Sequence, residues 1–202
     1  KKYTAALEAW GYLAKTGTTY AESSIRRISI LAGRAERESA LSVLREVAAS
    51  RDGEIQARAY YSLSTHLSGK EKREAEDKVI ALAPNSLFTT QILWRRGWGK
   101  WASGDVRGAV ADWERSLVPE MKTSWRPRVL YWVSKGYGRL NQPSKRDTFV
   151  KTLLKDHPLS IYAFLSGGEK LDIQAGDPPS LASRQPSELE KWEHLHDLTY
   201  AV

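Results

Sequence analysis

Residues 90–116 read TQILWRRGWGKWASGDVRGAVADWERS, and this stretch is the clearest indication of the fold class. It holds two helical patterns joined by a short turn at Gly104. In a helix-pair repeat frame of roughly 34 residues, Gly97 takes the eighth position, Ala109 the twentieth and Trp113 the twenty-fourth. Small, small and aromatic residues suit these positions because the two helices cross closely there. The stretch therefore predicts a tightly crossed helix pair.

Similar units recur along the chain with a looser period. Trp132 and Gly136 open the next copy, and Gly97 to Gly136 is 39 residues, longer than the standard repeat. Weaker copies lie upstream, over 57–84 and 28–48. Degenerate helix pairs of this length form an α-solenoid, in which each pair buries its apolar face against its neighbours. We predict an all-α fold: an α-α superhelix of degenerate tetratricopeptide-like helix pairs.

Helix start and stop signals recur at short intervals. No segment shows the alternation of apolar and polar residues that is typical of a half-buried strand. Ser86 and Asp105 are predicted N-caps, and Pro127 fits the first turn of a helix. Ser144 with Asp147, and Ser187 with Glu190, have the spacing of capping boxes. The predicted helices are 3–15, 22–33, 36–50, 54–68, 71–83, 86–102, 106–117, 126–140, 145–156, 159–166 and 187–201.

The chain divides into three parts in the sequence. The helical repeat region is predicted over 1–168, and a linker rich in Pro, Gly and Ser over 169–186. A further helical segment over 187–202 has no partner after it. We expect the chain to start at a cut inside a longer protein, and its end to be either another such cut or an exposed terminal helix. The sequence shows no signal peptide and no apolar run long enough to span a membrane.

The composition bounds the chemistry and the class of partner. There is no Cys, which excludes disulfides, cysteine-zinc sites and thiol nucleophiles. The net charge of +7 is uneven: residues 88–151 carry 13 basic and 5 acidic groups, whereas residues 152–202 carry 4 basic and 8 acidic groups. A basic middle favours an anionic partner, namely nucleic acid, a membrane surface or an anionic glycan.

The basic middle is also rich in tryptophan, with six of the eight Trp residues. Trp94, Trp98 and Trp101 form one helical stripe that we expect to pack against neighbouring helices. Arg95 and Arg96 lie off this stripe and are expected to point outward. Exposed aromatic rings beside arginine can stack on flat faces and hold anionic groups. Trp125, at a predicted helix start, is the tryptophan that we expect to be exposed.

No catalytic, metal or cofactor site is predicted. The acidic residues are scattered over polar helix faces, without the converging pair that a glycosidase needs. His194 and His196 are two residues apart, which puts them on nearly opposite faces of a helix, and the other histidines are isolated. A phosphate-binding glycine loop is absent as well.

Residues 130–140, LYWVSKGYGRL, resemble the "YW…R" helix in the superhelical region of soluble lytic murein transglycosylases. Residues 149–166, FVKTLLKDHPLSIYAFLS, are similar to that family's pattern of a helix, a proline, a small residue, an aromatic and a "YxxLA"-like end. Tyr162 and Leu165 hold the aromatic and leucine places, and Ser166 replaces the usual alanine. The resemblance is best over 88–166.

In that family the helical region wraps around and carries a lysozyme-like domain that cleaves peptidoglycan without water. The catalytic Glu lies in a Glu-Ser motif ahead of a Gly-Ala-x-Gly-Leu-Met-Gln-like stretch. Glu22 and Glu38 are each followed by Ser, but neither pair precedes such a stretch. The resemblance therefore implies the non-catalytic scaffold of a periplasmic enzyme. Its implied partners are peptidoglycan glycan strands and the missing catalytic domain.

The candidate substrate-binding residues are Arg95, Arg96, Trp125, Arg128, Tyr131 and Arg139. Two other functions stay open at this point. A tetratricopeptide-like adaptor would bind a protein segment in its concave groove. A nucleic-acid-binding helical repeat is disfavoured, because no reader motif is present and the basic excess is modest.

Overall fold

The computed structural model describes residues 3–16, 19–34, 36–49, 53–118, 121 and 124–167, all in the unit Lys1–Gly167. These residues form ten α-helices and no strand, which confirms the all-α prediction. The helices are α1 (Thr4–Lys15), α2 (Ala21–Arg34), α3 (Arg37–Ala48), α4 (Gly53–His66), α5 (Gly69–Leu82), α6 (Leu87–Ala102), α7 (Val106–Arg115), α8 (Arg126–Arg139), α9 (Pro143–Asp156) and α10 (Ile161–Leu165). The predicted linker and the helix predicted from Ser187 lie outside the described residues.

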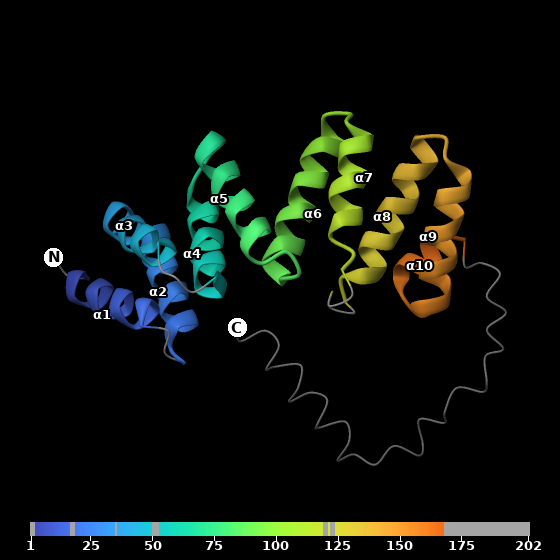
Figure 1. The fold of residues 1–202 in the computed structure, drawn as a ribbon. Coiled ribbons are helices and arrows are strands. Elements are labelled where there is room, and N and C mark those ends of the chain that lie inside the picture. Colours follow the sequence, from blue (N-terminus) through green and yellow to red (C-terminus); the bar gives the residue numbers. More distant parts are fainter. Residues whose placement is uncertain are drawn as a thin grey trace, which may run out of the picture. The chain divides into compact units, whose positions relative to one another are not determined.

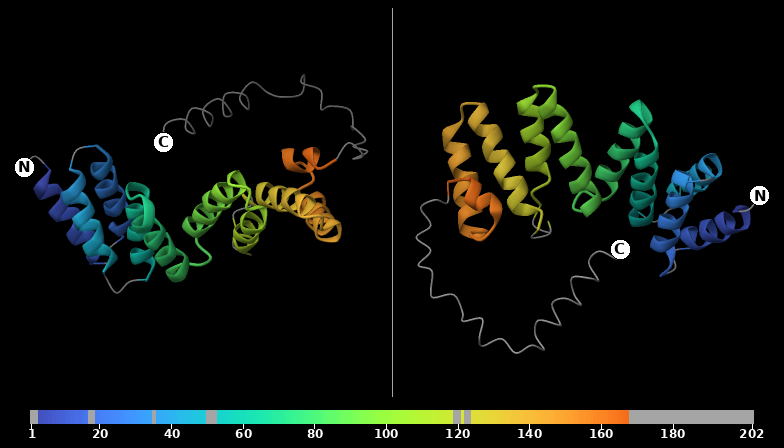
Figure 2. Two further views of the ribbon diagram at one scale, coloured as in Figure 1. Left: turned by 90° about the horizontal axis from the view of Figure 1, so that it is seen from above. Right: turned by 180° about the vertical axis from the view of Figure 1, so that it is seen from behind.

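Helices that follow one another in sequence also pack against one another (Figure 1). In addition, α1 contacts α3 and α2 contacts α4. The short α10 lies against both α8 and α9, as two further views show (Figure 2). This packing is consistent with the predicted helix pairs. The tetratricopeptide-like superhelix stays a prediction.

The helix boundaries reflect local capping chemistry. Ser86 and Asp105 are confirmed as N-caps: their side chains accept hydrogen bonds from the backbone N–H of Thr89 and Gly108. The predicted capping box at Ser144 is wrong. Helix α9 already begins at Pro143, whose missing N–H is not needed in a first turn, so Ser144 lies inside the helix and not before it.

Glycines allow two close crossings between helices. Gly97 on α6 faces Trp113 on α7, and a Cβ added to Gly97 would overlap the indole ring. Gly136 on α8 faces Val110 on α7 in the same way. Ala109, at the other small position of the frame, is fully buried. The close approach expected from the sequence of residues 90–116 is therefore present.

Two main hydrophobic cores lie in sequence on either side of the α5–α6 junction. One joins α1 to α4, with Ile28 and Leu44 at its centre. The other joins α6 to α8, around Trp113. A small cluster between them holds Val79, Ile80, Ile92 and Leu93. The contact between α5 and α6 is slight beside those of α4 with α5 and of α6 with α7.

Candidate functional site

The six tryptophans of the basic middle lie in one aromatic cluster on α6, α7, α8 and the residue before α8. Their ring centroids are as close as 4.6 Å, between Trp98 and Trp132. Trp113 is fully buried and donates a hydrogen bond from Nε1 to the carbonyl oxygen of Trp94, at 3.3 Å. The other five rings are partly buried. The predicted packing of the tryptophan stripe is therefore confirmed.

Trp125 and Arg128 are part of this cluster. Trp125 is partly buried and not exposed as expected, because its ring packs edge-on against Trp94 at 6.1 Å. The guanidinium of Arg128 lies 5.2 Å from the Trp125 ring centroid, and its Nε donates to the Tyr162 hydroxyl at 3.1 Å. Both candidate residues thus tie the start of α8 to α6 and α10.

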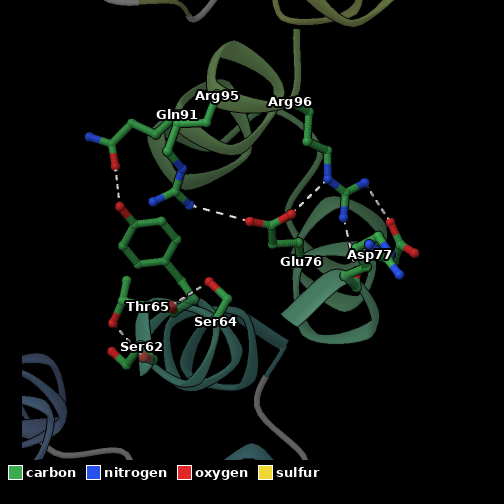
Figure 3. Close-up of polar contacts among 10 residues, drawn as sticks. Ser62, Ser64, Thr65, Glu76, Asp77, Gln91, Arg95 and Arg96 are labelled. Carbon is green, nitrogen blue, oxygen red and sulfur yellow. Dashed lines mark hydrogen bonds and ion pairs between the residues drawn. The ribbon is translucent and has the colours of Figure 1, made fainter. Parts of the chain in front are cut away.

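Arg95 and Arg96 lie at the α5–α6 junction, where both extend from α6 toward Glu76 on α5 (Figure 3). Arg96 does not point outward: its Nε is 2.7 Å from a carboxylate oxygen of Glu76, and its Nη1 is 2.7 Å from Asp77. Arg95 lies 3.5 Å from the other Glu76 oxygen. Glu76 is only 4% exposed, so its charge requires these partners.

The pKa of Arg96 reflects this network. Burial acts to lower it, but hydrogen bonds to Asp77 and Glu76 and their negative charges act in the opposite direction. The net pKa lies above the usual value for arginine. The guanidinium of Arg96 therefore links α6 to α5 through its bonds to Glu76 and Asp77. Arg96 is consequently a poor candidate for binding a ligand.

Tyr131 and Arg139 line a groove of about 610 Å³ on α8. We call this the α8 groove. The lining residues from α6 and α8 are Trp101, Tyr131, Trp132, Ser134, Lys135, Gly138 and Arg139. The lining residues from α9 and the end of α10 are Arg146, Asp147, Val150, Leu165 and Ser166. The structure thus brings together two of the six predicted site residues in one concave surface.

Two cations of the groove rest on aromatic rings. The guanidinium carbon of Arg139 lies 4.2 Å from the ring centroid of Trp101, and the Lys135 ammonium lies 5.3 Å from that of Tyr131. Both cations are exposed. Among the described residues neither forms an ion pair. By contrast, Arg146 is paired with Asp147 at 2.7 Å.

The groove residues that sequence reasoning missed include Trp101, Lys135 and Arg146. A usable signal existed for Lys135, because it lies four residues after Tyr131 and four before Arg139, on the same helix face. No comparable local signal existed for Arg146. It reaches the groove because α9 folds back along α8 after the turn at Asn141, so that its side chain lies beside Gly138.

Tyr137 forms a second buried polar link in this part of the chain. Its hydroxyl donates to a carboxylate oxygen of Glu114 at 2.6 Å, and its ring stacks on Phe149. Burial, followed by the hydrogen bond and the charge of Glu114, raises the pKa of Tyr137 to about 12. A phenol that stays protonated serves as a hydrogen-bond donor, so this pair joins α7 to α8.

The described part of the chain holds no group of three or more His, Asp or Glu side chains arranged to bind a metal ion. None of its helices has the length and apolar character needed to cross a membrane. Glu22, in one of the two Glu-Ser pairs, forms an ion pair with Arg58 at 2.5 Å.

No family model, curated protein or solved structure matches this chain. Its function is accordingly inferred from the chemistry of the α8 groove and from the sequence resemblance over 88–166.

Proposed function

We propose that this chain is the non-catalytic helical scaffold of a periplasmic lytic transglycosylase, and that it engages peptidoglycan through the α8 groove. In this role the chain would position glycan strands for a catalytic domain elsewhere in the same protein. The chain itself would perform no bond cleavage.

The observation that supports the proposal most strongly is which segments of the sequence line the α8 groove. Its lining comes largely from the two segments on which the family resemblance rests, 130–140 and 149–166. The same segments contact each other directly, since the rings of Tyr131 and Tyr162 are 5.5 Å apart. The resemblance therefore covers a spatial unit with a concave, aromatic and basic surface.

The chemistry of the groove suits a cell-wall polymer. Aromatic side chains offer flat apolar surfaces, and the cations held on them can bind anionic groups. Peptidoglycan combines sugar rings with carboxylates on its peptide stems. The six predicted site residues separate into three roles: Arg95 and Arg96 stabilise the α5–α6 junction, Trp125 and Arg128 the aromatic cluster, and Tyr131 and Arg139 line the groove.

The coding sequence beyond residue 202 tests the scaffold role. We expect it to encode a further domain with a Glu-Ser pair followed by a Gly-Leu-Met-Gln-like stretch. An unrelated domain, or a stop codon soon after residue 202, would contradict the scaffold role. It would favour the adaptor, in which a protein segment occupies the groove.

A further inference from the structure

The α8 groove presents two cations in a regular array. Tyr131, Lys135 and Arg139 are spaced by four residues, so they lie along one face of α8. Their Cβ atoms are separated by about one helical turn at each step. Lys135 and Arg139 both line the groove and both are exposed.

Aromatic rings restrict where these cations can lie. Trp101 carries the guanidinium of Arg139 at 4.2 Å, and Tyr131 carries the Lys135 ammonium at 5.3 Å. A cation held over a ring loses less conformational freedom when it binds an anion, which favours binding. The N–H groups at the edge of a stacked guanidinium stay available to an oxyanion.

The charge of the groove is unbalanced. It is lined by three cations, Lys135, Arg139 and Arg146, and by a single carboxylate, Asp147. That carboxylate is 2.7 Å from Nη2 of Arg146, its neighbour in sequence. In the described residues, Lys135 and Arg139 have rings but no carboxylate as partners.

We propose that the α8 groove binds the carboxylates of a short acidic peptide, one at Lys135 and one at Arg139. Neutral sugar rings would engage these cations more weakly, because a hydroxyl acceptor adds no opposite charge to the hydrogen bond, whereas a carboxylate does. This inference rests on the proposed function, and in that setting the ligand is the peptide stem of peptidoglycan and not its glycan backbone.

The test measures the Kd of soluble fragments by quenching of tryptophan fluorescence, with calorimetry as a second readout. The probes are a disaccharide-tetrapeptide with free carboxylates, the same fragment with its carboxylates amidated, and a neutral tetramer of N-acetylglucosamine. We expect only the first to bind well. Removing a charge-assisted hydrogen bond should weaken binding about tenfold or more, so the amidated fragment should bind at least that much more weakly.

The protein variants are K135Q with R139Q, measured beside R107Q with K145Q. The control pair also removes two exposed charges. One of these, Lys145, likewise lies over an aromatic ring, that of Tyr137 at 5.1 Å. Both control residues line a different hollow over α7, α8 and α9. We expect the first pair to weaken binding about tenfold or more, the control pair to have little effect, and both proteins to keep the wild-type melting temperature.

The outcomes separate this inference from the proposed function. Three results would each overturn the inference. They are equal binding of the free and amidated fragments, binding of the neutral tetramer as tight as that of the free fragment, and an equal loss of affinity in both variant pairs. If no soluble fragment binds while the chain still pellets with insoluble peptidoglycan, the inference fails and the proposed function stands. If no soluble fragment binds and the chain does not pellet with insoluble peptidoglycan, both the inference and the proposed function fail.

Discussion

Gly97 allows α6 and α7 to approach each other closely where they cross. A side chain there would overlap the Trp113 ring, which is itself fully buried against its neighbours. Gly99, two residues further along the same helix, is exposed, and a Cβ added there would meet no atom within 4 Å. These two glycines thus differ in packing but share one helix.

We predict opposite effects for alanine at these two positions. Gly97→Ala should destabilise the fold by about 1–3 kcal/mol, because overpacking forces the indole or the helix to shift. Gly99→Ala should stabilise it by about 0.5–1 kcal/mol, because alanine has the higher helix propensity. Urea denaturation followed by circular dichroism measures both. Equal effects would show that α6 and α7 do not cross closely at Gly97.

His66 is the described histidine for which a stability effect follows from its surroundings. It lies 2.9 Å from the Ser29 hydroxyl, and its carbonyl oxygen accepts a hydrogen bond from Arg37. Burial, followed by the positive charge of Arg37, lowers the pKa of the imidazole, with a hydrogen bond to the Ser29 backbone acting in the opposite direction. The folded state therefore favours neutral His66 more strongly than the unfolded state does.

The sign of the pH dependence follows. Because the folded pKa lies below the usual 6.5, the unfolded chain takes up the proton first as the pH falls, and stability declines below about pH 6.5. We expect His66→Gln to lose less stability than the wild type between pH 7.5 and pH 5. Melting temperatures at both pH values measure this. A larger loss in the variant would contradict the lowered pKa.

At the scale of the element, the helix boundaries were largely predictable from sequence, because capping and stop signals are local. The prediction for α6, 86–102, differs by one residue at its start from the observed Leu87–Ala102. The error at α9 arose because two local signals competed, and Pro143 determined the helix start in preference to Ser144. Side-chain partners were less predictable: Arg96 meets Glu76, which is 20 residues away in sequence.

Capping gives a matched prediction. Asp105→Ala should cost about 1 kcal/mol, because the N–H of Gly108 loses its 2.8 Å acceptor at the start of α7. Ser144→Ala should cost nothing measurable, because Ser144 is exposed and is not the N-cap of α9. Denaturant unfolding compares the two variants directly. A similar cost at both positions would restore the capping box at Ser144.

The α5–α6 junction depends on its ionic network. Arg96→Met leaves the buried carboxylate of Glu76 with only the more distant Arg95, and should cost about 1–3 kcal/mol. The control is Lys70→Met, which removes an exposed pair with Glu74 and should cost less than about 0.5 kcal/mol. Unfolding measurements on both variants test this. Equal costs would show that burial of Glu76 contributes nothing.

At the scale of the whole molecule, the basic segment of the sequence coincides with one part of the fold. The segment with 13 basic and 5 acidic groups, 88–151, contains α7, α8, all of α6 except its first residue, and most of α9. The sequence predicts this basic region but does not show which of its cations are paired with carboxylates. The structure distinguishes them, because Arg96 is committed to Glu76 and Asp77, whereas Arg139 remains unpaired by any described carboxylate.

We propose that this helical chain engages peptidoglycan, and co-sedimentation with insoluble peptidoglycan measures that binding. We predict that the wild-type chain pellets with the polymer at low salt. Raising the salt to about 0.5 M should release it, because salt screens exposed cations such as Lys135 and Arg139. A chain that stays in the supernatant at low salt, or that pellets equally at both salt concentrations, would contradict the account.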